Sequence, residues 1–116
     1  MSIRPEFVER IFAGTKRYEL RRVVFSESVR TVVVYATAPV GRVVGEFDVG
    51  AIYALAPSAL WEAVKPGAGI DEQSFKAYFD GCQVGHAIEI AAVTSYPHPL
   101  PIGAFTARPP QSFVYL

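Results

Sequence analysis

The sequence predicts an α+β fold, in which about five or six mixed strands form a small β-barrel with helices packed around it. Segments rich in β-branched residues alternate with segments of helical periodicity. The longest predicted strand, 42–55, contains Gly45 and Gly50, and interior glycines favour bends or bulges. A curled sheet is therefore favoured over a doubly wound one. With 116 residues, 51% of them hydrophobic, the chain suffices for one core, so we expect a single domain over residues 1–116.

The first predicted element is a helix from Pro5 to Ala13. Proline suits the first helical position, and Phe7, Ile11 and Phe12 recur at helical spacing. Gly14 fits the left-handed position that closes a helix. Strands are expected next at residues 17–23, 29–37 and 42–55, with a turn at 39–41 and a bulge near one of the interior glycines.

The middle of the chain is predicted to be helical. Ser58 can cap a short helix through Ala63, which stops before Pro66. A second helix is expected from Glu72 to Phe79, ending at Gly81. The rest should comprise a strand at 86–96, an irregular proline-rich crossing at 97–110 and a last strand at 112–116 that closes the sheet.

Composition narrows the possible functions. No apolar run reaches the roughly 18 to 20 residues of a membrane helix, and the N-terminus does not read as a signal peptide. The single Cys82 excludes an internal disulfide and fits a reducing compartment. We therefore expect a cytoplasmic protein without a membrane partner.

The net charge of zero hides an asymmetry along the chain. Residues 1–30 hold seven basic and four acidic side chains, and the other 86 hold four basic and seven acidic ones, so the two parts carry +3 and −3. A dedicated duplex binder is usually basic overall. This distribution favours one local basic site, and a solvated charged face is the alternative.

The stretch from Gly14 to Arg22, G-T-K-R-Y-E-L-R-R, concentrates the ionisable side chains. On a strand, Glu19 and Arg21 point to the same face, so the carboxylate can hold the guanidinium and leave donors for a phosphate or a base edge. Lys16, between helix and strand, would add a flexible point charge. The alternative is a surface ion pair without a ligand, worth under about 1 kcal/mol.

These residues resemble a known family. Gly14-x-Lys16-x-x-Glu19-x-Arg21 matches the G-x-K-x-x-E-x-R signature of the ASCH domain, within the PUA-like superfamily. Three later segments resemble those of its small stand-alone bacterial, archaeal and phage branch, namely 35–41 (Y-A-T-A-P-V-G), 44–47 (V-G-E-F) and 110–113 (P-Q-S-F). The resemblance implies a PUA-like barrel with a cleft beside the signature. It also implies RNA or nucleotide recognition, often linked to translation or transcription coactivation.

Further side chains are candidates for the same ligand site. Tyr35 and Thr37 share a strand face and are either ligand contacts or core residues. Trp61, the only tryptophan, can cover a bound base or simply pack its helix. Glu46 lies on an otherwise buried strand and should be paired with Lys16 or an arginine. The predicted ligand-binding set is Gly14, Lys16, Glu19, Arg21, Tyr35, Thr37, Glu46 and Trp61; Gln111 and Ser112 join it only through the resemblance.

We expect no metal and no cofactor, because no Cys or His cluster has zinc spacing and no phosphate-binding or nucleotide-binding loop is present. Three functions remain open. The first is binding of RNA or a nucleotide. The second is hydrolysis through Lys16 and Glu19, either of RNA or, as in some similar proteins, of an acylated cytidine. For the latter, Glu19 stands where a threonine is expected and residues 67–69 offer no glutamate. The third is a protein-interaction module using the segment 97–110.

Overall fold

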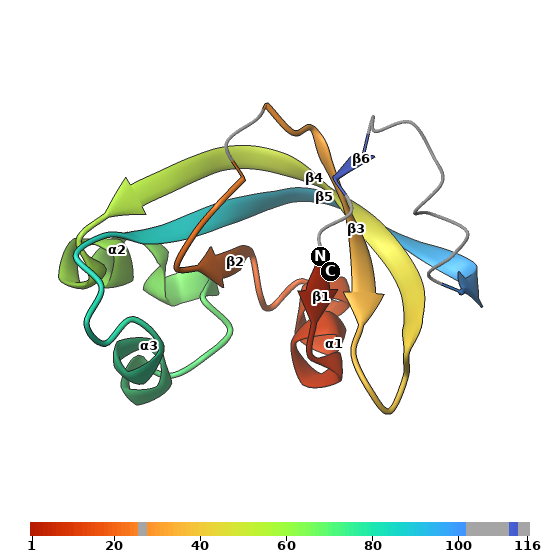
Figure 1. Cartoon of the computed structure of the whole chain (residues 1–116), viewed down its shortest axis with the longest axis horizontal. Coiled ribbons are helices and arrows are strands. Elements are labelled where there is room, and N and C mark those ends of the chain that lie inside the picture. Colours follow the sequence, from red (N-terminus) through yellow and green to blue (C-terminus); the bar gives the residue numbers. More distant parts are fainter. Residues whose placement is uncertain (26–27, 102–111, 114–116) are drawn as a thin grey trace.

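The computed structural model describes residues 1–25, 28–101 and 112–113 of the chain. Figure 1 shows its elements, which in chain order are β1 (Ser2–Ile3), α1 (Pro5–Ala13), β2 (Tyr18–Arg21), β3 (Thr31–Ala36), β4 (Arg42–Leu55), α2 (Pro57–Val64), the 3-10 turn η1 (Lys65–Gly67), α3 (Glu72–Tyr78), β5 (Gly85–Leu100) and β6 (Ser112–Phe113). None of the helices in the described ranges has the length and apolar character needed to cross a membrane.

The strands form one mixed sheet in the order β1-β3-β4-β5-β2, and β6 also pairs with β3. β1 and β6 run parallel to β3, whereas the other neighbours are antiparallel. The predicted α+β class is confirmed, but the closed barrel is wrong. In the described ranges no backbone ladder joins the outer strands β1 and β2. Their seam is bridged by a side chain, because Arg21 Nη2 on β2 donates to the Ser2 carbonyl on β1 at 2.9 Å.

The long strands β4 and β5 form a ribbon that arches over the helices (Figure 1). Register shifts at Val43/Gly45, Asp48/Val49 and Val49/Ile52 bend it, as the interior glycines predicted. A Cβ on Gly45 would lie 2.4 Å from the Thr94 carbonyl oxygen and 2.7 Å from the Phe12 ring. A glycine at this position therefore lets α1 pack closely against the concave side of the sheet.

Two apolar cores fill the concave side of the sheet. One lies under α1, where Val8 and Ile11 meet buried side chains of β3 and Phe47. The other lies under α2 and α3, where Leu60 and Phe75 meet Leu20. The strands β1 and β2, the helix α1 and the region of α3 border the space between these cores, and Lys16, Glu19 and Arg21 line it.

The predicted element bounds hold best where the local signal is strong. The helix at Pro5–Ala13 is confirmed, as is its closure by Gly14 at φ 84°. The two-residue strand β1 was not predicted. β5 continues to Leu100, so the prediction of an irregular crossing is wrong for residues 97–100. The prolines there are tolerated because β2 pairs with residues 86–89 of β5, and in the described ranges no strand pairs with that edge near Pro97 and Pro99. Residues 102–111 and 114–116 lie outside the described ranges.

Candidate functional site

The chain reverses sharply between α1 and β2, and this turn delivers Lys16 to the concave side. Gly14 adopts the left-handed conformation that only glycine takes without strain. The backbone N–H groups of Thr15 and Lys16 then both donate to the Arg10 carbonyl at 3.0 Å. The N–H of Arg17 donates to the Gly67 carbonyl at 2.7 Å, which docks the turn onto η1. Gly14 thus orients the site without lining it.

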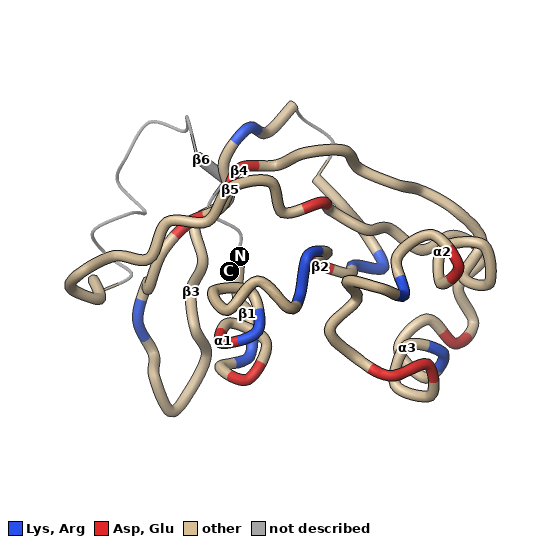
Figure 2. The backbone as a smooth tube through the Cα atoms, turned by 180° about the vertical axis from the view of Figure 1, so that it is seen from behind, with Lys and Arg blue, Asp and Glu red and all other residues tan. Residues whose placement is uncertain are grey.

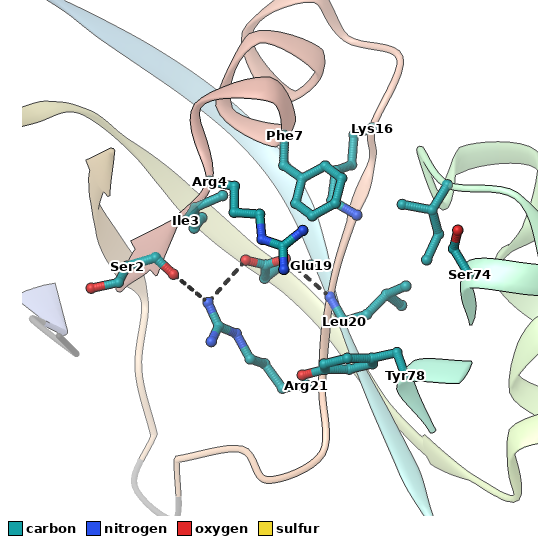
Figure 3. A pocket seen from close by; sticks show the side chains of 11 residues that line it. Ser2, Ile3, Arg4, Phe7, Lys16, Glu19, Leu20, Arg21, Ser74 and Tyr78 are labelled. Carbon is teal, nitrogen blue, oxygen red and sulfur yellow. Dashed lines mark hydrogen bonds and ion pairs between the residues drawn. The ribbon is translucent and has the colours of Figure 1, made fainter. Parts of the chain in front are cut away.

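A cleft of about 330 Å³ opens between β1, α1, β2 and the segment leading into α3 (Figure 3). Three of the four signature residues line it, namely Lys16, Glu19 and Arg21. The other lining residues are Ser2, Ile3, Arg4, Phe7, Leu20, Ile70, Ser74 and Tyr78. The cleft therefore combines charged groups with an apolar and aromatic wall, as ligand sites commonly do.

Lys16 is not the flexible point charge that the sequence predicted. The residue is only 2% exposed, and Nζ donates to the Ala68 carbonyl oxygen at 2.6 Å. Nζ also lies 5.2 Å from the centroid of the Phe7 ring. Burial lowers the pKa of Lys16 below its ordinary value of 10.5, the Glu19 charge opposes this, and the positive charges of Arg10 and Arg21 add to it. Lys16 is thus a fixed amine at the base of the cleft.

The segment 67–69 forms the support for Lys16, a role that the sequence did not reveal. Ala68 is fully buried and supplies the carbonyl that holds Nζ. Gly69 has φ 72°, and a Cβ there would lie 2.6 Å from Lys16 Cγ and 2.7 Å from Lys16 Cβ. The absence of a side chain at Gly69 therefore makes room for the aliphatic part of the lysine. A glycine after Pro66 and Gly67 predicts a turn. Its contact with Lys16, which lies 53 positions earlier in the sequence, had no local signal.

Glu19 and Arg21 contact each other, as the strand alternation predicted. Arg21 Nη2 donates to Glu19 Oε2 at 3.1 Å, and Glu19 Oε1 accepts the Leu20 N–H at 3.2 Å. Because Glu19 is only 5% exposed, this is not the solvated surface pair considered as the alternative. Arg21 Nε is buried without a hydrogen-bond partner among the described residues. The guanidinium is therefore held in place with a donor unused.

The surroundings of the cleft are positive. Arg4, Lys16 and Arg21 line it against a single carboxylate, Glu19. Phe7 lies amid three cations, with Arg4 Cζ at 5.9 Å and Arg10 Cζ at 5.5 Å from its ring centroid, in addition to Lys16. Figure 2 shows Lys and Arg gathered along the β1, α1 and β2 part of the chain. The predicted local basic site corresponds to this region.

Two predicted site residues lie on the other face of the sheet. Glu46 accepts a hydrogen bond from Tyr96 Oη at 2.8 Å, so the predicted pairing with Lys16 or an arginine is wrong. The reason is the pleat, because Glu46 lies opposite Val33 in the β3–β4 ladder, whereas its neighbour Phe47 faces the core under α1. Tyr35 packs with Val33 in the small cluster on the same face as Glu46.

Thr37 and Trp61 are also outside the cleft lining. Thr37 follows β3, and its N–H donates to the Ile3 carbonyl at 3.0 Å. The Trp61 ring lies 5.0 Å from the Phe75 ring, within the core under α2 and α3. Its packing interpretation therefore agrees with the structure. Gln111 lies outside the described residues, and Ser112 is described only as part of β6.

Tyr78 and Arg4 are cleft residues that sequence reasoning missed. Tyr78 is fixed by Arg22, whose Nε donates to the Tyr78 carbonyl at 2.7 Å and whose Cζ lies 4.6 Å from the ring centroid. Arg4 immediately precedes α1. Because α1 leads directly into the signature segment, this position in the sequence could have suggested that Arg4 lies near the site. In the described ranges no group of three or more His, Cys, Asp or Glu side chains is arranged to hold a metal ion.

Fold and site together define an α+β domain on one curled mixed sheet, whose G-x-K-x-x-E-x-R segment faces a recessed basic cleft. The chain belongs to the ASCH domain family, since the sequence model of the ASCH domain matches residues 1–96. The resemblance inferred from the signature is confirmed.

Solved structures show the same fold. ASCH from Zymomonas mobilis superposes with a TM-score of 0.83 at 28% identity, covering 97% of this chain and 82% of that one. A tyrosine-to-phenylalanine variant of that protein gives the same TM-score at 27% identity, covering 97% and 84%.

Among curated relatives, the ASCH domain-containing ribonuclease of Zymomonas mobilis subsp. mobilis is 32% identical over 84 residues, which are 72% of this chain and 57% of that protein. Large ribosomal subunit protein uL22 of Ureaplasma parvum serovar 3 is 30% identical over 89 residues, 76% of this chain and 29% of that protein. The chain thus spans less than a third of the latter relative and little more than half of the former.

Proposed function

We propose that this domain binds RNA by holding a backbone phosphate in the cleft. The observation that carries the proposal is the pair of recessed cations, Lys16 and Arg21, with Arg21 Nε unpartnered among the described residues. Membership of the ASCH family and the relative named a ribonuclease support RNA as the ligand class.

The physical chemistry favours a phosphate oxygen over a neutral group. Arginine forms strong charge-assisted hydrogen bonds to phosphate, and the bonds from Nη2 to Glu19 and to the Ser2 carbonyl preorganise the guanidinium. Attraction between charges grows in a recessed site because the effective dielectric is lower than in water. Tyr78 and Phe7 add aromatic surface on which an unpaired base can stack.

Binding of a single-stranded oligouridylate over a range of salt concentrations tests this proposal. Lys16→Met and Arg21→Gln should each weaken binding roughly ten-fold or more and reduce the salt slope by about one. Arg42→Gln is the charge-matched control, because Arg42 is exposed on β4 and does not line the cleft. Equal affinities for the two cleft variants and the control would overturn the proposal.

Cleavage of the bound RNA is the second candidate, and the lowered pKa of Lys16 favours it. A lowered pKa enlarges the neutral fraction of the Lys16 amine, and the neutral form can accept the proton of a ribose 2′-hydroxyl. The 2′-oxygen then bonds to the adjacent phosphorus, the bond to the 5′-oxygen breaks, and solvent protonates that oxygen, leaving a 2′,3′-cyclic phosphate. Arg21 would stabilise the charge on the phosphate. Glu19, already engaged with Arg21 and the Leu20 N–H, positions the guanidinium.

Lys16→Arg separates binding from cleavage, because arginine keeps the charge but stays protonated. If cleavage uses the amine, this variant retains RNA binding and loses the cyclic-phosphate product. A variant that cleaves at the wild-type rate would overturn the assignment. The acylated-cytidine alternative finds no support in the site, because the segment 67–69 contains no carboxylate and Lys16 Nζ donates there to the Ala68 carbonyl.

In the described ranges, no cluster of exposed side chains supports the alternative of a protein-interaction module. Among the described residues, several large apolar side chains that are exposed are spread along the β4–β5 ribbon. Ile52, Leu55 and Val84 lie towards one end, Val93 lies midway opposite Phe47, and Leu100 lies at the other end. They do not define a single docking face.

A further inference from the structure

We propose that a second hollow beside the cleft holds the next nucleotide of the same RNA strand, with Arg10 contacting the linking phosphate. This inference rests on the proposed function and extends it from one bound phosphate to at least two nucleotides of single-stranded RNA. It assigns a role to Arg10, which lies outside the signature.

The second hollow borders the cleft. It has a volume of about 490 Å³ and shares Phe7, Ile70 and Ser74 with the cleft. Both volumes fall in the range of roughly 300–1,000 Å³ that small-ligand sites occupy. Phe7 therefore stands at the junction of two neighbouring spaces, and one flexible strand can pass from one to the other.

Arg10 is placed for the phosphate between the two nucleotides. Its Nη1 donates to the Gly69 carbonyl at 2.8 Å, and its Cζ lies 5.5 Å from the Phe7 ring centroid. The side chain is thus anchored at two points, while the guanidinium has further N–H donors for an anion. Arg10 and Lys16 approach the same ring, so cations of both hollows meet at the junction.

Asp71 determines how a nucleotide is oriented in the second hollow. Its exposed carboxylate accepts the Ser74 N–H at 2.7 Å, and that hydrogen bond lowers the Asp71 pKa, so the group is an anion at neutral pH. A phosphate beside it would be repelled. The phosphate accordingly belongs at Arg10, and the sugar and base belong over the apolar surface of Pro66 and Ile70 towards Asp71.

The depth of the cleft selects a single strand. Lys16 and Glu19 are almost completely buried, so the phosphate must enter a recess to approach them. A rigid A-form duplex presents its backbone on a convex surface and is recognised across its wide minor groove. An unpaired strand can follow the turn past Phe7, and its bases remain free to stack on the aromatic wall.

The experiment compares 5′-uridylate with the dinucleotide pdUpU, whose 2′-deoxy position blocks cleavage, in competition against a fluorescent oligouridylate. In the wild type, the second nucleotide should tighten binding roughly ten-fold. Arg10→Gln should lose this gain and keep its affinity for 5′-uridylate, whereas Arg10→Lys should retain part of the gain. Asp71→Asn preserves the helix cap and should tighten binding of pdUpU only.

The outcomes separate the two proposals. Suppose that Arg21→Gln weakens binding of both probes, whereas Arg10→Gln and the wild type gain the same affinity from the second nucleotide. The proposed second subsite is then wrong, and the proposed phosphate site in the cleft still stands. If duplex RNA binds as tightly as the single strand, the single-strand assignment is wrong. If Arg21→Gln binds 5′-uridylate like the wild type, the proposed function itself fails. Circular dichroism of each variant checks that the fold is kept.

Discussion

Gly69→Ala should destabilise the domain by crowding Lys16. The new Cβ would lie 2.6 Å from Lys16 Cγ and 2.7 Å from Lys16 Cβ. These atoms are close to the lysine backbone, so they cannot rotate away as the end of a long side chain would. The turn, the lysine or both must shift, and the bond from Nζ to the Ala68 carbonyl depends on that geometry.

The expected magnitude has two parts. A left-handed alanine costs about 1–2 kcal/mol relative to glycine, and overpacking of a close site adds about 1–3 kcal/mol. Gly81→Ala isolates the first part, because Gly81 has φ 79° and a Cβ added there would meet no atom within 4 Å. We therefore expect Gly69→Ala to lose about 1–3 kcal/mol more than Gly81→Ala.

Urea unfolding of both variants measures these free energies, and the same proteins are then assayed for RNA binding. Gly81→Ala should bind like the wild type, whereas Gly69→Ala should bind more weakly because it displaces Lys16. In a double-mutant cycle, Lys16→Ala removes the Cγ and Cδ contacts with the new methyl group, so it should recover part of the crowding cost.

Equal losses of stability in Gly69→Ala and Gly81→Ala would refute this reasoning. So would strict additivity in the cycle, because independent effects would mean that residue 69 does not position Lys16. A Gly69→Ala domain that is destabilised but binds RNA normally would limit Gly69 to a structural role.

Three further predictions concern the charges and the tryptophan. Because the Lys16 pKa is lowered in the folded protein, the unfolded chain binds this proton more tightly. The free energy of unfolding of the wild type, relative to Lys16→Met, should therefore rise as pH increases towards 10.5. Parallel profiles of unfolding free energy against pH for the two proteins would contradict this. Glu19→Gln should cost about 1–3 kcal/mol in urea unfolding, against under about 1 kcal/mol for the exposed Glu62→Gln; equal costs would contradict it. Trp61→Phe should cost about 1 kcal/mol and leave RNA affinity unchanged, whereas weakened binding would return Trp61 to the site.

Local rules predicted the parts of the site that depend on neighbouring residues. The closure of α1 follows from one glycine, and the contact of Glu19 with Arg21 follows from the two-residue period of a strand. Glu46 shows what strand alternation alone cannot predict. Alternation places its side chain on one of two faces, but which face is the concave one depends on the pairing of β4 with β3 and on a bulge.

Contacts between distant segments could not be predicted in the same way. Lys16 meets Ala68 only because η1 docks on the turn after α1, and nothing local to either segment encodes that approach. The prediction of a closed barrel was wrong for a related reason. The curl of β4 and β5 was readable from glycines, but closure depends on whether the outer strands are long enough to pair, and β1 has only two residues.

The open seam and the buried charges belong to one arrangement. A closed ladder between β1 and β2 would satisfy the Ser2 carbonyl with a backbone N–H and fill the space beside it. In the open sheet that carbonyl accepts from Arg21, so the guanidinium spans the gap and remains next to the cleft. Burying Lys16 and Glu19 in the same place costs desolvation free energy, which mutual attraction only partly offsets. Such a cost is characteristic of a site kept for binding, and it explains why we expect charge removal at Lys16 to affect RNA binding more than folding.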